Sequence, residues 1–148
     1  MERIKEIIAE NRRIAGALLP VLQRIQEIYG WLPPAALEAV AEGLDIPPAE
    51  VVGTVSFYSF LNTEKPGTYI IRVCKSAPCH IQGTAATIEA LEKCLGIKVG
   101  DTTSDGKFTL RACECLGICD RAPAVMVNEE VFGPVRAGDV ADLLSKFE

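Results

Sequence analysis

Six cysteines, all in the second half of the chain, constrain this sequence more than any other feature. They stand at Cys74, Cys79, Cys94, Cys113, Cys115 and Cys119. The N-terminus lacks the apolar stretch and small-residue cleavage site of a secretory signal, so we expect a cytoplasmic protein. In a reducing compartment, closely spaced cysteines serve metal binding or redox chemistry more often than disulfide formation. The cysteines therefore predict a metal or redox centre.

Charge and missing motifs exclude several functional classes. The 148 residues include 15 Lys and Arg against 20 Asp and Glu, and neither half has a basic arm, so nucleic acid and anionic membranes are not expected partners. No apolar run approaches the roughly 20 residues of a membrane span, which predicts no direct membrane insertion. With His80 as its single histidine, the chain cannot form a two-histidine zinc helix or a Rieske centre. Glycine-rich nucleotide loops are also absent, so the sequence holds no complete active site.

The pattern of apolar residues divides the chain into two predicted domains. Apolar residues recur at helical spacing in four segments of the first half, near residues 4–8, 21–29, 37–44 and 51–58. The polar residues 62–67 are typical of a turn, and we place the domain boundary there. We therefore expect a small helical bundle over residues 1–66 and a second domain over residues 67–148.

The second half has an α/β pattern. Alternating and β-branched apolar residues predict strands over residues 68–73, 108–112, 124–127 and 131–132. Helical spacing predicts one helix that ends before Gly96 and a closing helix from about Val140. The order β-α-β-β-β-α predicts one sheet with helices packed on it, which is an α/β fold.

Four of the cysteines have the spacing of metal ligands. Cys74 and Cys79 form a C-x4-C pair, and Cys115 and Cys119 form a C-x3-C pair. Each pair follows a predicted strand, so two loops at the same end of a sheet can bring four thiolates together. Four thiolates are what a [2Fe–2S] cluster requires, two for each iron. Gly117 would let the second loop turn tightly around such a cluster.

The spacing alone leaves other interpretations open. A four-cysteine zinc site in a zinc-stabilised interaction module accepts both spacings. A thioredoxin-type dithiol needs C-x-x-C, which is absent, and a catalytic Cys79 would need its sequence neighbour His80 as a base. Backbone amides at the start of the following helix, near Gly83, are expected to favour the Cys79 thiolate.

The two remaining cysteines have separate interpretations. Cys94 lies between Leu91 and Leu95, which predicts a buried thiol on the apolar face of a helix. Cys113 stands two residues before Cys115 and could replace it as a ligand if the strand continued.

Two segments resemble the ligand loops of a known family. The runs CKSAPCHIQG over residues 74–83 and ECLGICDRAP over residues 114–123 are similar to those of the small [2Fe–2S] subunit of NADH:quinone oxidoreductase (respiratory complex I). Further similarity to this family lies in residues 19–30, 46–47, 55–58 and 100–110. The resemblance covers nearly the whole chain.

The resemblance implies a fold, a cofactor and partners. It implies an N-terminal helical domain, a C-terminal thioredoxin-like domain, and one [2Fe–2S] cluster held by Cys74, Cys79, Cys115 and Cys119. The implied partners are a flavoprotein subunit that binds FMN and NAD(H) and a larger iron–sulfur subunit. Such a complex is cytoplasmic or a peripheral part of a membrane-attached assembly. The same resemblance extends to subunits of soluble NAD(P)-linked [FeFe]-hydrogenases, electron-bifurcating ones included, and of NAD-dependent formate dehydrogenases.

Overall fold

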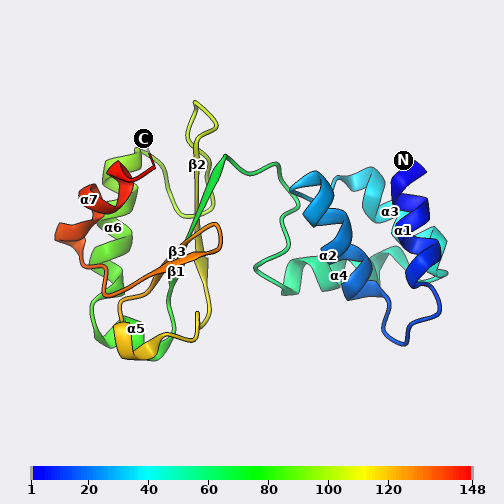
Figure 1. The fold of residues 1–148 in the computed structure, drawn as a ribbon, viewed down its shortest axis with the longest axis horizontal. Helices are drawn as coiled ribbons and strands as arrows, with labels where there is room; N and C mark the ends of the chain where they lie inside the picture. The colour runs from blue at the N-terminus through cyan, green and yellow to red at the C-terminus, as the bar shows by residue number, and fades with distance from the viewer. Residues whose placement is uncertain (1, 148) are drawn as a thin grey trace. The chain divides into compact units, whose positions relative to one another are not determined.

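The chain forms two compact units. The computed structural model describes residues 2–147, and the units are Met1–Lys65 and Pro66–Glu148 (Figure 1). Within the described residues, no helix has both the length and the apolar character needed to cross a lipid bilayer.

The first unit is built from four helices. They are α1 (Glu2–Asn11), α2 (Leu18–Tyr29), α3 (Pro34–Leu44) and α4 (Pro48–Phe57). Pro34 and Pro48 stand in the first turns of α3 and α4, where a missing backbone N–H costs no helical hydrogen bond. Gly30 ends α2 with a φ of 79°, and its N–H donates to the carbonyl of Gln26. The predicted helical bundle is therefore present.

The second unit holds one sheet of four strands. The strands are β1 (Tyr69–Cys74), β2 (Phe108–Cys113), β3 (Val125–Val127) and β4 (Glu130–Phe132), in the order β2-β1-β3-β4. The helices are α5 (Ala77–Ile81), α6 (Thr84–Leu95) and α7 (Val140–Ser145), with 3₁₀ turns η1 (Cys119–Arg121) and η2 (Ala137–Asp139). All four predicted strands and both predicted helices are present, within a few residues of their expected ends.

The pairing of β1 with β2 places two cysteines side by side. These strands are parallel, and Cys74 is in register with Cys113 at their carboxyl ends. On the side of β1 away from β2, β3 pairs antiparallel with β1, and β4 pairs antiparallel with β3. Because parallel strands end at the same edge of a sheet, the segments after Cys74 and after Cys113 leave from one end.

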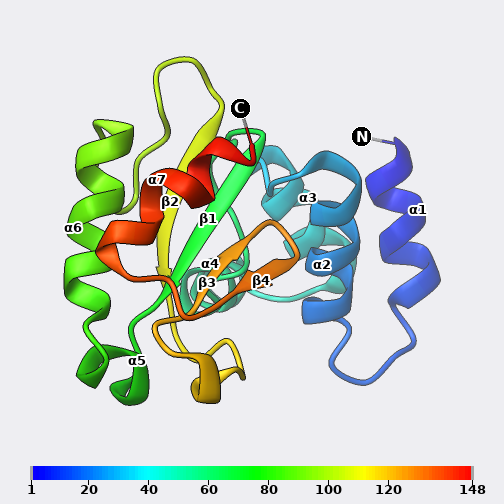
Figure 2. The same ribbon diagram turned by 60° about the vertical axis from the view of Figure 1, so that its left-hand side comes forward.

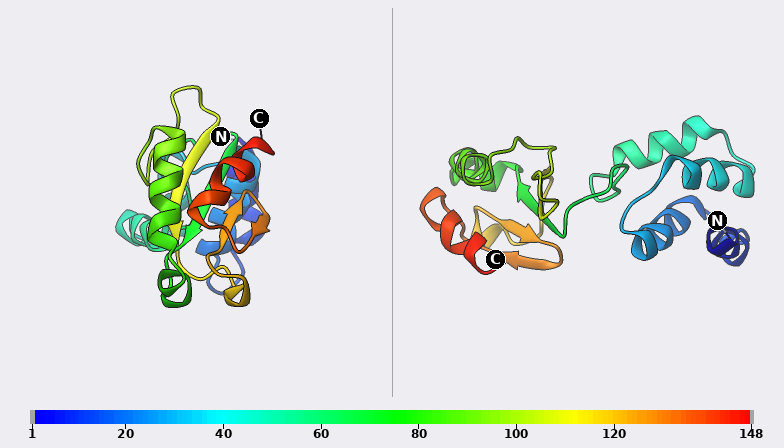
Figure 3. Two further views of the ribbon diagram at one scale, coloured as in Figure 1. Left: turned by 90° about the vertical axis from the view of Figure 1, so that its left-hand side faces the viewer. Right: turned by 90° about the horizontal axis from the view of Figure 1, so that it is seen from above.

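A core between the sheet and two helices holds this end in place. Ile71 and Val73 of β1 and Leu110 of β2 belong to one buried cluster, where they pack with Leu91 of α6 and Leu143 of α7. Figure 3 shows α6 and α7 on the same side of the sheet. Each fully buried side chain of this size contributes about 1.5–3 kcal/mol to the free energy of unfolding.

Two local predictions are wrong. Cys79, expected on a loop, lies on α5, a helix of five residues that is too short to show a helical period in the sequence. Cys94, expected to be buried, is exposed. The buried positions of α6 are Thr84, Thr87 and Leu91, and Cys94 stands in the last turn of the helix, beyond the last of these positions.

Candidate metal centre

The four cysteines that the sequence pairs gather at one end of the sheet. Cys74 is the last residue of β1, Cys79 lies on α5, and Cys115 closely follows β2. Cys119 begins the turn η1. Figure 2 shows α5 and this turn, drawn in gold, at the same end of the sheet. The parallel pairing of β1 and β2 is what brings segments so distant in the sequence together.

The second pair has the spacing of two thiolates on one metal. The Sγ atoms of Cys115 and Cys119 are 3.6 Å apart. Two sulfurs bound tetrahedrally at about 2.3 Å lie about 3.8 Å from each other. The N–H of Gly117 donates to the Cys115 Sγ at 3.3 Å, and Gly117 has the left-handed φ of 81° expected of it. The loop therefore presents both sulfurs and an amide donor on one side.

The first pair is buried and touches the second loop. Cys74 and Cys79 are each 1% exposed and belong to one buried cluster, against which Leu116 and Ala122 of the second loop pack. The backbone N–H of Leu116 acts to lower the pKa of Cys74, and the backbone N–H of Ala124 acts to lower the pKa of Cys79. Amide donors of this kind offset the charge of ligating thiolates.

The pKa values of the thiols follow from this environment. Burial disfavours the Cys74 thiolate, but hydrogen bonds from Ser76, Cys79 and Leu116 outweigh it and hold the pKa of Cys74 below its ordinary value. Burial first, and then the neighbouring Cys74, raise the pKa of Cys79. The backbone donor that favours the Cys79 thiolate is Ala124, and burial together with Cys74 outweighs it. The hydrogen bond with Cys115 raises the pKa of Cys119.

The cysteines form two pairs and not one group of four. Among residues 2–147, no three His, Cys, Asp or Glu side chains lie close enough together to ligate one ion. A zinc site would need four thiolates around a single ion, whereas a [2Fe–2S] cluster takes two thiolates at each iron. Two pairs of cysteines can supply the two thiolates that each iron of a [2Fe–2S] cluster takes.

Cys113 is the last residue of β2 and stands opposite Cys74 in the sheet. It is 1% exposed at the end of β2, and burial raises the pKa of its thiol to about 11. Its carbonyl accepts a hydrogen bond of 2.9 Å from the N–H of Lys75. Cys113 is paired with Cys74 within the sheet, whereas Cys115 stands in the second loop with its sulfur 3.6 Å from that of Cys119.

Contacts that the sequence analysis missed hold both loops. The Thr84 hydroxyl donates to the carbonyl of Cys74 at 2.8 Å, and Thr84 is buried. On the second loop, the Arg121 Nε donates to the carbonyl of Gly133 at 3.0 Å. No local pattern marks these two hydrogen bonds, because each joins segments that are distant in the sequence. The Ala122–Pro123 peptide bond, whose isomer the sequence leaves open, is cis.

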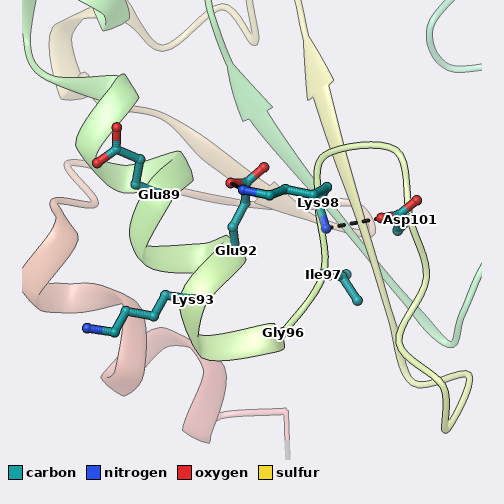
Figure 4. A pocket seen from close by; sticks show the side chains of 7 residues that line it. All are labelled: Glu89, Glu92, Lys93, Gly96, Ile97, Lys98 and Asp101. Atoms are coloured by element: carbon teal, nitrogen blue, oxygen red, sulfur yellow. Dashed lines mark hydrogen bonds and ion pairs between the residues drawn. The ribbon is translucent and has the colours of Figure 1, made fainter.

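A surface pocket away from the two cysteine pairs is lined by residues that hydrogen-bond to one another. It lies at the end of α6, where Glu92 accepts hydrogen bonds from the Lys98 Nζ at 2.6 Å and the Val99 N–H at 3.1 Å (Figure 4). The Asp101 carboxylate accepts the Lys98 N–H at 3.1 Å. These contacts shape the loop that follows α6, and they explain the pocket without a ligand.

Known proteins resemble this chain over most of its length. A family model described as thioredoxin-like [2Fe-2S] ferredoxin matches residues 4–148. A subunit of the NADH-quinone oxidoreductase of Pseudomonas aeruginosa is 42% identical over 132 residues, which cover 89% of this chain and 80% of that protein. The HndA subunit of the NADP-reducing hydrogenase of Solidesulfovibrio fructosivorans is 38% identical, covering 89% of this chain and 77% of that protein.

A solved structure matches the fold. A chain of the NAD+-reducing [NiFe]-hydrogenase in its air-oxidised state superposes with a TM-score of 0.68 and 27% identity, over 85% of this chain and 22% of that one. The predicted family is confirmed, and so is the predicted architecture of a helical bundle followed by a thioredoxin-like domain. The chain belongs to the thioredoxin-like [2Fe-2S] ferredoxin family.

Proposed function

We propose that this chain is an electron-transfer subunit of an NADH:quinone oxidoreductase-type complex, in which Cys74, Cys79, Cys115 and Cys119 hold the [2Fe–2S] cluster after which its family is named. The observation that carries the proposal is the meeting of two sulfur pairs at one end of the sheet. An equivalent subunit of an NAD(P)-linked hydrogenase or formate dehydrogenase is the alternative, favoured by the similarity to a hydrogenase subunit.

The surroundings of the cysteines suit a centre that exchanges single electrons. The cluster supplies the one-electron chemistry when bound, and the protein holds it and sets its potential. Cys74 and Cys79 anchor one side away from water, whereas Cys115 and Cys119 are exposed. The amide donor of Gly117, on the second loop, stabilises negative charge on the Cys115 sulfur. A partner would therefore approach from the exposed pair.

The proposed partner is a flavoprotein subunit that binds FMN and NAD(H), together with a larger iron–sulfur subunit. The chain has no nucleotide-binding loop, so the nicotinamide and flavin would bind elsewhere. Its relatives are named as subunits of NADH-quinone oxidoreductase and of NADP-reducing hydrogenase. The chain would add an electron carrier to such a complex, without substrate chemistry of its own.

Serine substitutions test the ligand set. The parent chain, isolated without oxygen, should contain about two irons and about two acid-labile sulfides per chain, as one [2Fe–2S] cluster requires. Reduction with dithionite should give a low-temperature EPR signal. Each of Cys74→Ser, Cys79→Ser, Cys115→Ser and Cys119→Ser should lower the iron content or shift the EPR spectrum. Cys94→Ser, on the exposed face of α6, is the matched control and should leave both unchanged.

Cys113→Ser discriminates between neighbouring thiols. We expect this variant to keep the parent's EPR spectrum, because Cys113 lies within β2 and Cys115 is the residue whose sulfur lies next to that of Cys119. Loss of the cluster in Cys113→Ser together with its retention in Cys115→Ser would refute the proposed ligand set. A colourless parent chain that contains zinc would instead support a zinc-stabilised interaction module.

A further inference from the structure

A groove between α1 and α3 concentrates positive charge on the helical unit. It has a volume of about 500 Å³ and is lined by Lys5, Arg12 and Arg13 together with small apolar residues. These are three of the six basic residues in residues 1–65. Glu42 is the carboxylate among the described residues that line it. The groove is therefore locally positive on a chain whose formal net charge is −5.

The floor of the groove is apolar and closed. α1 and α3 pack against each other, and a Cβ at Gly43 would lie 2.7 Å from the Ile8 Cγ2 (Figure 1). Ile8 is 5% exposed. The two helices therefore meet as closely as a glycine allows, and the groove above this contact has a defined apolar base.

The basic side chains of the groove have no partner among residues 2–147. Lys5, Arg12 and Arg13 form no ion pair there. The other arginines of the helical unit are paired along their own helices: Arg3 with Glu6 at 2.8 Å, and Arg24 with Glu27 at 2.7 Å. The unit thus neutralises its arginines elsewhere and leaves those of the groove available.

We propose that this groove binds an acidic segment of another subunit in the same complex, with carboxylates beside Arg12 and Lys5 and an apolar side chain over Ile8. The inference rests on the proposed function, since it requires that the chain works as a subunit. Charge complementarity selects an acidic protein segment. A membrane surface or a nucleic acid would call for a wider basic patch than three residues.

Exposed charges of this kind act mainly on association and its salt dependence. Ion pairs at the rim of an interface steer the partner and weaken as salt screens them. Reversing one groove charge should therefore lower the salt concentration at which the chain leaves its complex, by about twofold. The cluster, in the other unit, should be unaffected.

Salt release of the chain from its purified complex tests the proposal. The complex is isolated through a tag on a partner subunit from cells that make the parent chain, Arg12→Glu or Arg24→Glu. Both substitutions replace an exposed arginine by glutamate, but Arg24 lies outside the groove. We expect Arg12→Glu to be released at about half the NaCl concentration that releases the parent, and Arg24→Glu to behave like the parent. Both variants should keep the parent's EPR spectrum.

A cross-link identifies the occupant. A photo-reactive amino acid replaces Ala9, which lines the groove, and the cross-linked partner peptide is sequenced. A peptide rich in Asp and Glu supports the proposal. It is overturned by a neutral or basic peptide, by equal salt release of the two variants, or by binding to phosphatidylglycerol vesicles that Arg12→Glu abolishes. If the parent carries its cluster but copurifies with no other subunit, the assignment as a complex subunit fails as well, whereas equal release from an intact complex refutes the groove alone.

Discussion

The turn that carries Cys119 is held against Gly133, and Gly133→Ala measures how much this contact matters. A Cβ at Gly133 would overlap the carbonyl oxygen of Arg121 and lie 3.1 Å from the Arg121 Cβ. The overlapping atom belongs to the backbone, so a rotamer change cannot relieve the clash. Either the turn η1, which begins at Cys119, or the segment that follows β4 must therefore move.

The expected cost combines two effects. Overpacking of a close contact costs about 1–3 kcal/mol. A shift of the turn also weakens the 3.0 Å hydrogen bond from the Arg121 Nε to the Gly133 carbonyl, which is worth about 0.5–1.5 kcal/mol. Because the Arg121 side chain is exposed, we take the lower part of this range and expect a loss of about 2 kcal/mol. With a urea slope of about 2 kcal/mol per molar, the midpoint should fall by about 1 M.

Urea titration followed by circular dichroism, and by the visible absorption of the cluster, provides the measurement. Gly138→Ala is the matched control: it lies in the same unit, and nothing stands within 4 Å of the added Cβ. The control should unfold within a few tenths of a molar of the parent. An unchanged midpoint for Gly133→Ala, or an equal drop for both variants, would show that the turn is not held by this contact.

Single contacts and the domain boundary give three more expectations. Thr84→Val removes the buried hydrogen bond to the Cys74 carbonyl and should cost about 1–2 kcal/mol in thermal or urea unfolding, whereas Thr84→Ser should retain most of the stability. Hydrogen bonds from Lys98 and Val99 lower the pKa of Glu92, so its carboxylate stabilises the fold above its ordinary pKa of 4.5. This contribution is lost as the pH falls through the lowered pKa. The free energy of unfolding of Glu92→Gln should therefore fall less steeply than that of the parent at acid pH, and an equal fall would contradict this role of Glu92. If residues 1–66 and 67–148 are separate domains, limited proteolysis should cut first within residues 62–67 and leave two resistant fragments, while early cleavage inside α2 or α6 would argue against this division.

The sequence by itself determined which elements form. Periods of two and of three to four residues marked every strand and helix of the sheet unit except α5, because these patterns reflect which side of an element faces the core. Helix ends at Pro34, Pro48 and Gly30 are also local features, because proline and glycine have their own backbone preferences. The cysteine spacing indicated a four-thiolate centre, since two residues in one loop are tied together by the chain itself.

Only the tertiary structure decided how the cysteines meet. Cys113 and Cys115 are both candidates in the sequence, but the register of β1 with β2 buries Cys113 beside Cys74 and leaves Cys115 exposed. The support of the loops by Thr84 and by Gly133 joins residues that are distant along the chain. Such contacts depend on strand pairing and on helix packing over the whole unit, so no window of the sequence contains the interactions that select them.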